Sequence, residues 1–165
     1  MQSIKSFIAR RRDSEEGFTL IELMVVVLII AILIAVMIPI FVGAKTRAQD
    51  RAAQSSLRNG LTAAKVVYSD HADYTLATTA ELTLVEPDLD WVAAASASSG
   101  PNSLSVDPAS TTYIVFAGLS KSGSCFFLSD DASVGGVGVL YAKAAGSCNA
   151  SVAPAPGDPA WTPTW

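Results

Sequence analysis

Histidine is nearly missing from this 165-residue chain, because His71 is the only one. A catalytic site built on imidazole would have to use that residue, which falls at the expected end of a long helix. Two cysteines and one distant histidine do not supply the four ligands of a structural zinc site. The sequence also has no phosphate-binding loop. We therefore expect no enzyme activity, no cofactor and no metal site.

Charged residues are also scarce, at 16% of the chain, and the formal net charge is -4. A nucleic-acid-binding surface needs clustered Lys and Arg. The one tight basic cluster, Arg10 to Arg12, stands just before an apolar run, where basic residues usually set membrane orientation. We therefore expect no nucleic acid binding.

Residues 17–44 read GFTLIELMVVVLIIAILIAVMIPIFVGA, and residues 23–44 contain no charged side chain. A helix of this length can span the roughly 30 Å hydrocarbon core of a bilayer. Glu22 is the exception near the start of the run. A carboxylate in the middle of a spanning helix costs about 2.5 to 3.5 kcal/mol on insertion scales. We therefore expect Glu22 to be paired with another group.

The sequence Gly17-Phe18-Thr19-Leu20-Ile21-Glu22 resembles the processing and assembly motif of type IV pilins and type II secretion pseudopilins. The resemblance implies a leader of residues 1–17 that prepilin peptidase removes after Gly17. It also implies N-methylation of Phe18. By the same resemblance, Glu22 neutralises the amine of an adjacent subunit during filament assembly. The leader departs from many members at Glu15 and Glu16, where a basic residue is common.

Ordinary signal-peptidase cleavage before Lys45 is an alternative, because small residues precede that position. However, the apolar run is longer than the 7 to 15 residues of a signal-peptide core, and Glu22 would have no purpose there. An intact single-pass anchor is a further alternative.

The apolar run is expected to be helical, because backbone groups in lipid must be bonded internally. Pro39 either ends this helix or kinks it, and the pilin resemblance favours a kink with the helix continuing. Residues 45–68 then show apolar side chains at three- and four-residue spacing. This stripe needs a partner surface, and it consists of Ala53, Leu57, Leu61, Ala64 and Tyr68.

Beyond the helix, residues 72–110 are expected to be loop-rich, with a short helix at 79–85 that Thr79 would cap. Three segments rich in β-branched and aromatic residues predict an antiparallel meander: 111–118, 124–129 and 137–143. We interpret Asp130 and Asp131 as part of a solvated turn, in preference to calcium ligands. The expected fold is α+β, with a three-stranded antiparallel sheet covered by the amphipathic half of the helix, as in pilins.

Cys125 and Cys148 lie about 23 residues apart. In an exported domain a disulfide is the leading interpretation, worth roughly 3 to 3.5 kcal/mol; two buried free thiols are the alternative. A C-terminal disulfide is also common in pilins. The Pro-rich tail, residues 151–165, is expected to be extended. Its Trp161 and Trp165 either pack on the head or a neighbouring subunit, or stay exposed.

The leading hypothesis is a structural subunit of a type IV pilus, with a leader (1–17), an apolar transmembrane and assembly segment (18–44) and a globular head (45–165). The resemblance implies a homopolymer, with prepilin peptidase and a membrane-bound assembly machinery as partners. The chain would lie in the cytoplasmic membrane first and in an extracellular filament afterwards. The alternatives are a type II secretion pseudopilin, a minor pilin, and a single-pass anchored surface binding protein that does not polymerise.

Overall fold

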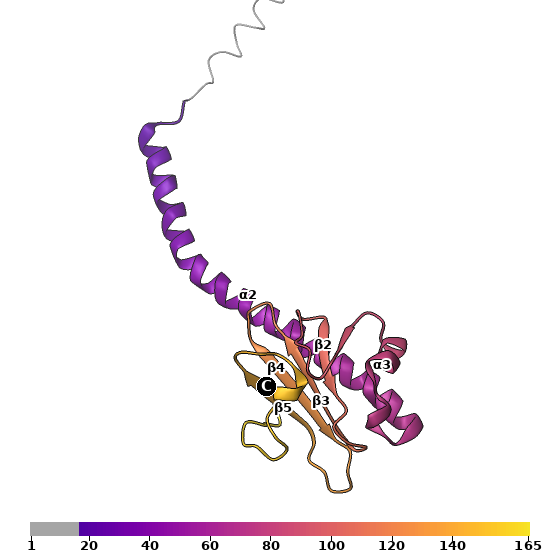
Figure 1. Cartoon of the computed structure of the whole chain (residues 1–165). Coiled ribbons are helices and arrows are strands. Elements are labelled where there is room, and N and C mark those ends of the chain that lie inside the picture. Colours follow the sequence, from indigo (N-terminus) through magenta and orange to yellow (C-terminus); the bar gives the residue numbers. More distant parts are fainter. Residues whose placement is uncertain (1–16) are drawn as a thin grey trace, which may run out of the picture. The chain divides into compact units, whose positions relative to one another are not determined.

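A computed structural model describes residues 17–165 (Figure 1). All but the last residue of the predicted leader therefore lies outside the described residues. The chain divides after Gly43 into two compact units. We describe each unit by itself and call residues 44–165 the head. One helix, α2 (Leu20–His71), contributes to both units.

The helix α2 is 52 residues long. It does not end at Pro39, because the residues on both sides of the proline are helical. It ends at His71, as expected, three residues after the last stripe residue, Tyr68. Ala72 then takes a positive φ of 53° and donates from its N–H to the Tyr68 carbonyl at 2.7 Å, which closes the last turn. The kink at Pro39 stays a prediction.

In the first unit, every described residue before Gly43 is exposed. The exposed side chains are large and apolar on all sides of the helix, including Phe18 at 85% and Phe41 at 69%. By length and composition this part of α2 can cross a membrane. A helix that is apolar all round is stable only where lipid or other helices surround it.

The head contains one five-stranded sheet in the order β1-β2-β3-β4-β5. The strands are β1 (Asp90–Ala93), β2 (Ser103–Asp107), β3 (Tyr113–Leu119), β4 (Cys125–Asp131) and β5 (Gly138–Ala144). β1 and β2 pair in parallel, and the other neighbours are antiparallel. The α+β fold is confirmed, and β3 to β5 correspond to the three predicted strands.

The prediction of only three strands was wrong, because β1 and β2 form within a segment expected to be loop. These strands are short, and β2 reads SLSVD, so neither shows a run of β-branched residues. Their polar side chains find partners inside the fold. Ser105, which is fully buried, donates from its hydroxyl to the Ala93 carbonyl at 3.1 Å and accepts from the Ala150 N–H at 2.9 Å.

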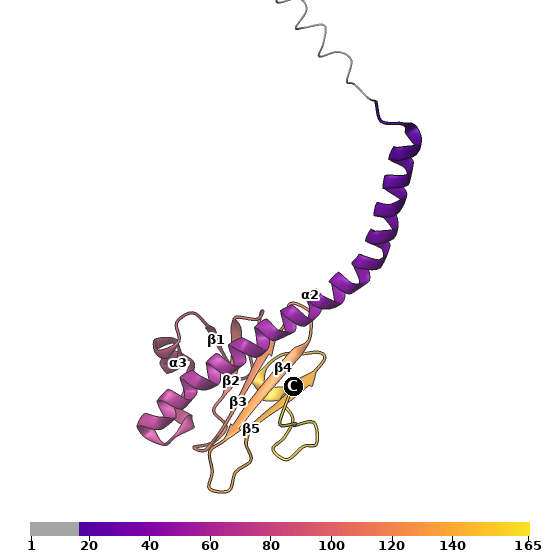
Figure 2. The ribbon, with the colours of Figure 1, turned by 180° about the vertical axis from the view of Figure 1, so that it is seen from behind.

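The predicted apolar stripe of α2 covers one face of this sheet (Figure 2). Four of the five stripe residues are buried there and Tyr68 is partly buried; the sheet contributes Leu104, Val106, Ile114, Phe116, Phe126 and Leu128. Gly60 allows the close approach. A Cβ at Gly60 would lie 2.7 Å from Cδ1 of Leu104 and 3.2 Å from the Trp91 ring.

The short helix α3 (Thr79–Val85) forms as predicted, but its N-cap is Thr78 and not Thr79. The Thr78 hydroxyl accepts from the Glu81 N–H at 3.4 Å. Two 3-10 turns, η1 (Tyr74–Leu76) and η2 (Ala150–Val152), complete the head.

The opposite face of the sheet is covered by the C-terminal segment. The predicted disulfide is confirmed, and Cys125–Cys148 links the start of β4 to the chain after β5. Trp161, 8% exposed, packs in the same cluster. Thr162 forms an isolated antiparallel β-bridge with Tyr141 of the edge strand β5. Trp165 packs edge-on against Phe126 on the helix side of the sheet, with 5.1 Å between the ring centres. The tail therefore packs on the head and shields the β5 edge.

A buried polar contact fixes one end of α2 to the sheet. The Tyr74 hydroxyl donates to Asp130 at 2.5 Å, and the Lys65 ammonium lies 3.2 Å from the other carboxylate oxygen. Asp130 is 3% exposed and lies in β4, so its assignment to a solvated turn was wrong. Burial and the bond to Asp130 raise the pKa of Tyr74, which stays protonated as the donor.

Asp50 makes the corresponding contact toward the start of the head. Its carboxylate accepts from the hydroxyls of Ser120, at 2.7 Å, and Ser122, and lies 3.6 Å from the Lys143 ammonium. Partial burial raises the pKa of Asp50, but the two hydroxyls and Lys143 outweigh it and leave the pKa below its usual value.

We predict that Tyr74→Phe lowers the free energy of unfolding of the head by about 1 to 3 kcal/mol, because Asp130 then loses a buried donor. Denaturant unfolding of the full chain in maltoside micelles measures this. Tyr68→Phe is the matched control, since no described residue accepts a hydrogen bond from that hydroxyl. Equal stability of the two variants would contradict the assignment.

The lowered pKa of Asp50 also predicts a pH dependence. Its carboxylate stabilises the head above its unfolded-state pKa of about 3.9, and this contribution is lost as the pH falls through the lower folded-state pKa. The stability difference between wild type and Asp50→Ala should therefore shrink from about pH 6 to about pH 3. The exposed Asp88→Ala should change stability by less than about 0.5 kcal/mol. A difference for Asp50→Ala that is independent of pH would contradict the role of the charge.

Candidate functional site

The candidate site is the segment from Gly17 to Glu22 at the start of the described chain. Gly17, Phe18 and Thr19 are not helical, and α2 begins at Leu20. All of these residues are exposed. The peptide bond between Gly17 and Phe18 therefore lies in exposed, irregular backbone, which is the kind of segment that proteases cleave.

Thr19 and Glu22 form a reciprocal cap on the first turn of α2. The Glu22 carboxylate accepts through Oε2 from the Thr19 N–H at 2.9 Å and from the Thr19 hydroxyl at 2.7 Å. The Thr19 hydroxyl in turn accepts from the Glu22 N–H at 3.3 Å. This arrangement is a capping box. The sequence signal for it, Thr followed three residues later by Glu before an apolar run, was missed in the sequence analysis.

The cap shows how an acidic side chain is accommodated at this position. Glu22 lies in the first turn of α2, where its negative charge interacts favourably with the helix dipole. The hydrogen bonds that its carboxylate accepts all use Oε2, and no described residue donates to Oε1. Glu22 therefore has an internal partner and a free oxygen for a second one.

The other predicted site residues lie elsewhere in the chain. Pro39 is inside α2, and Cys125 and Cys148 form the disulfide of the head. Among residues 17–165, no group of three or more His, Cys, Asp or Glu side chains could hold a metal ion.

Residues 12–38 match the family described as the prokaryotic N-terminal methylation motif. The chain carries the type IV prepilin signature. The matched segment includes Gly17, Phe18 and Glu22, and it ends just before Pro39. Type IV pilin-like proteins and pseudopilins share this motif, and the family is structural rather than enzymatic. Comparison with curated proteins and with solved structures found no match for the chain.

We predict that Thr19→Val in the unprocessed chain speeds amide hydrogen exchange at Glu22 and Leu23 by about 2- to 30-fold. This range corresponds to the usual 0.5 to 2 kcal/mol of a helix N-cap. NMR-detected exchange in maltoside micelles measures it. Thr62→Val, an exposed change within the head part of α2, is the control and should leave both amides unchanged. Unaltered exchange in Thr19→Val would show that the cap does not stabilise the helix start.

Proposed function

We propose that this protein is the structural subunit of a type IV pilus. In this proposal prepilin peptidase cleaves between Gly17 and Phe18, Phe18 is N-methylated, and the mature chain polymerises through residues 18–44. The observation that carries the proposal is the methylation motif at 12–38, with Gly17 and Glu22 in register and an exposed apolar helix directly after them.

Cleavage would turn the Phe18 nitrogen from an amide into a charged amine at the start of an apolar helix. Such a charge is costly in lipid or among packed apolar helices unless an anion accompanies it. Glu22 is one helical turn away. Because Thr19 uses only Oε2, the free Oε1 can accept from an amine while the capping box stays intact.

The partner amine in this proposal belongs to an adjacent subunit in the filament. Offset neighbours would be held in register by this charge pair, and the apolar helices would then pack by van der Waals contact. Pro39 leaves one helical hydrogen bond unmade, and we propose that the helix kinks there. The subunit would wait in the cytoplasmic membrane until the assembly machinery extracts it into the extracellular filament.

The decisive test separates the charge of Glu22 from its capping role. Glu22→Gln keeps an acceptor for the cap but loses the charge. We predict that Glu22→Gln is inserted and cleaved normally. The yield of sheared surface filaments should fall at least about tenfold, because the substitution leaves the Phe18 amine without an anionic partner. Immunoblots of membrane and filament fractions measure both quantities.

Thr19→Val is the matched control, because it weakens the cap and keeps the charge. It should reduce filaments less than Glu22→Gln does. Wild-type filament yield from Glu22→Gln, or a larger loss from Thr19→Val, would show that the carboxylate acts as a cap only.

A further inference from the structure

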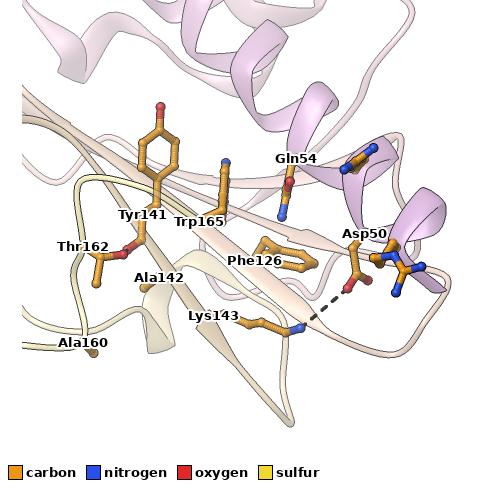
Figure 3. A pocket seen from close by; sticks show the side chains of 11 residues that line it. Asp50, Gln54, Phe126, Tyr141, Ala142, Lys143, Ala160, Thr162 and Trp165 are labelled. Carbon is orange, nitrogen blue, oxygen red and sulfur yellow. Dashed lines mark hydrogen bonds and ion pairs between the residues drawn. The ribbon is translucent and has the colours of Figure 1, made fainter. Parts of the chain in front are cut away.

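The head contains a pocket of about 510 Å³ that the assembly proposal does not use. It lies between the first head turns of α2 and strands β4 and β5, and the tail forms its rim (Figure 3). The lining combines Arg47 and Arg51 from α2 and Lys143 from β5 with three aromatic rings from the sheet and tail, and it also includes the Asp50 carboxylate. The aromatic residues are Phe126, Tyr141 and Trp165.

Two of these cations, Arg47 and Arg51, have no anionic partner among the described residues. Lys143 is paired with Asp50 and also lies 5.1 Å from the centre of the Phe126 ring. Within residues 17–165, the ion pairs are those of Lys65 and Lys143, so no carboxylate there lies within 4.0 Å of Arg47 or Arg51. The three cations outnumber the single Asp50 carboxylate, so the side chains that line the pocket carry a net positive charge, although the chain as a whole carries a net charge of -4.

The two arginines are suited to one shared anion. Arg47 and Arg51 are four residues apart on α2, which places them on the same face of the helix. A guanidinium presents a planar fork of donors that binds phosphate in a bidentate manner. Two forks on one face favour a phosphate group over a single carboxylate.

The aromatic side of the pocket is held in place by ring contacts. Trp165 lies 5.1 Å from Phe126 and 4.7 Å from Tyr141, measured between ring centres, and the three labelled rings stand together in Figure 3. The Trp165 indole N–H is buried and donates to no described residue. Trp and Tyr of this kind are enriched at the level of lipid headgroups.

We propose that this pocket binds the headgroup phosphate of an anionic phospholipid while the subunit is still in the membrane. The position along α2 selects this ligand. Arg47 and Arg51 follow the apolar segment, which ends at residue 44, by only three and seven residues in sequence, so the chain keeps both of them close to the membrane surface. Arginine side chains bury their apolar stems and extend their charged ends toward the headgroup layer.

This inference rests on the membrane-anchored stage of the proposed function, but it does not need filament assembly. The bound lipid would hold the part of the head that carries Arg47 and Arg51 at the membrane surface until the subunit is extracted. A negative result in the filament test with Glu22→Gln would therefore not contradict the lipid-binding inference. The test of lipid binding uses the monomer.

The test is an NMR titration of the full mature chain in maltoside micelles, read at the indole N–H resonance of Trp165. The probes are dihexanoyl phosphatidylglycerol, dihexanoyl phosphatidylcholine, inorganic phosphate and a short DNA duplex. Phosphatidylglycerol should shift the Trp165 resonance saturably, and at least about tenfold more tightly than the zwitterionic lipid.

The double variant Arg47→Gln with Arg51→Gln should weaken phosphatidylglycerol binding about 25-fold, because each cation near a lipid surface contributes about fivefold. Arg58→Gln, an exposed arginine outside the pocket, is the control and should change binding less than twofold. Unmoved Trp91 and Trp161 resonances verify that the double variant is folded.

Three results would overturn the proposal. Equal binding of both lipids, or no shift with either, would remove the anionic headgroup as ligand. Saturation by inorganic phosphate at the same concentration would make this a free-anion site. Tighter binding of DNA would make it a nucleic-acid site. The wild-type titrations alone distinguish these results if the double variant does not fold.

Discussion

The burial of the first half of α2 is the requirement on which the rest of this molecule depends. Residues 17–42 are exposed and almost wholly apolar in the single chain, and each large apolar side chain gains about 1.5 to 3 kcal/mol when it is removed from water. A bilayer can supply that burial to the isolated chain, and in the proposed filament packed helices would supply it. In that proposal, helix–helix contacts replace lipid contacts when subunits assemble.

The same helix serves a second purpose in the head, where its pattern changes. After Gly43 only one stripe of α2 is apolar, and that stripe covers the helix-facing side of the sheet. Asp130 with Tyr74 and Lys65, and Asp50 with Ser120 and Ser122, fix the helix at two separate positions. The disulfide and the tail cover the opposite face. Both core clusters of the head consist of head residues alone, so in the proposed function the apolar segment is available for assembly.

The elements with a strong local pattern could be predicted from the sequence, and those that depend on tertiary contacts could not. The helix stripe and strands β3 to β5 follow from the spacing and type of their apolar residues. Strands β1 and β2 are polar and short, so they show no strong local pattern. Asp130 has the composition of a turn residue in sequence, and it is accommodated in a buried strand because it accepts a hydrogen bond from Tyr74, which is 56 positions away. At the candidate site the motif indicates the roles of Gly17, Phe18 and Glu22. The cap by Thr19 was not predicted, because in an apolar run the charge of Glu22 suggests an external partner, whereas the carboxylate also bonds to Thr19 three residues before it.

The mass and N-terminal sequence of the mature protein from the cell surface test the central claim most directly. The account predicts a chain that begins at Phe18 and carries one additional methyl group on its amine. That result would establish both the cleavage after Gly17 and the new amine that Glu22 is proposed to neutralise. A chain that begins at Lys45 would contradict the account, because it would have lost the whole apolar segment. An intact Met1 would also contradict it and would indicate a plain membrane anchor.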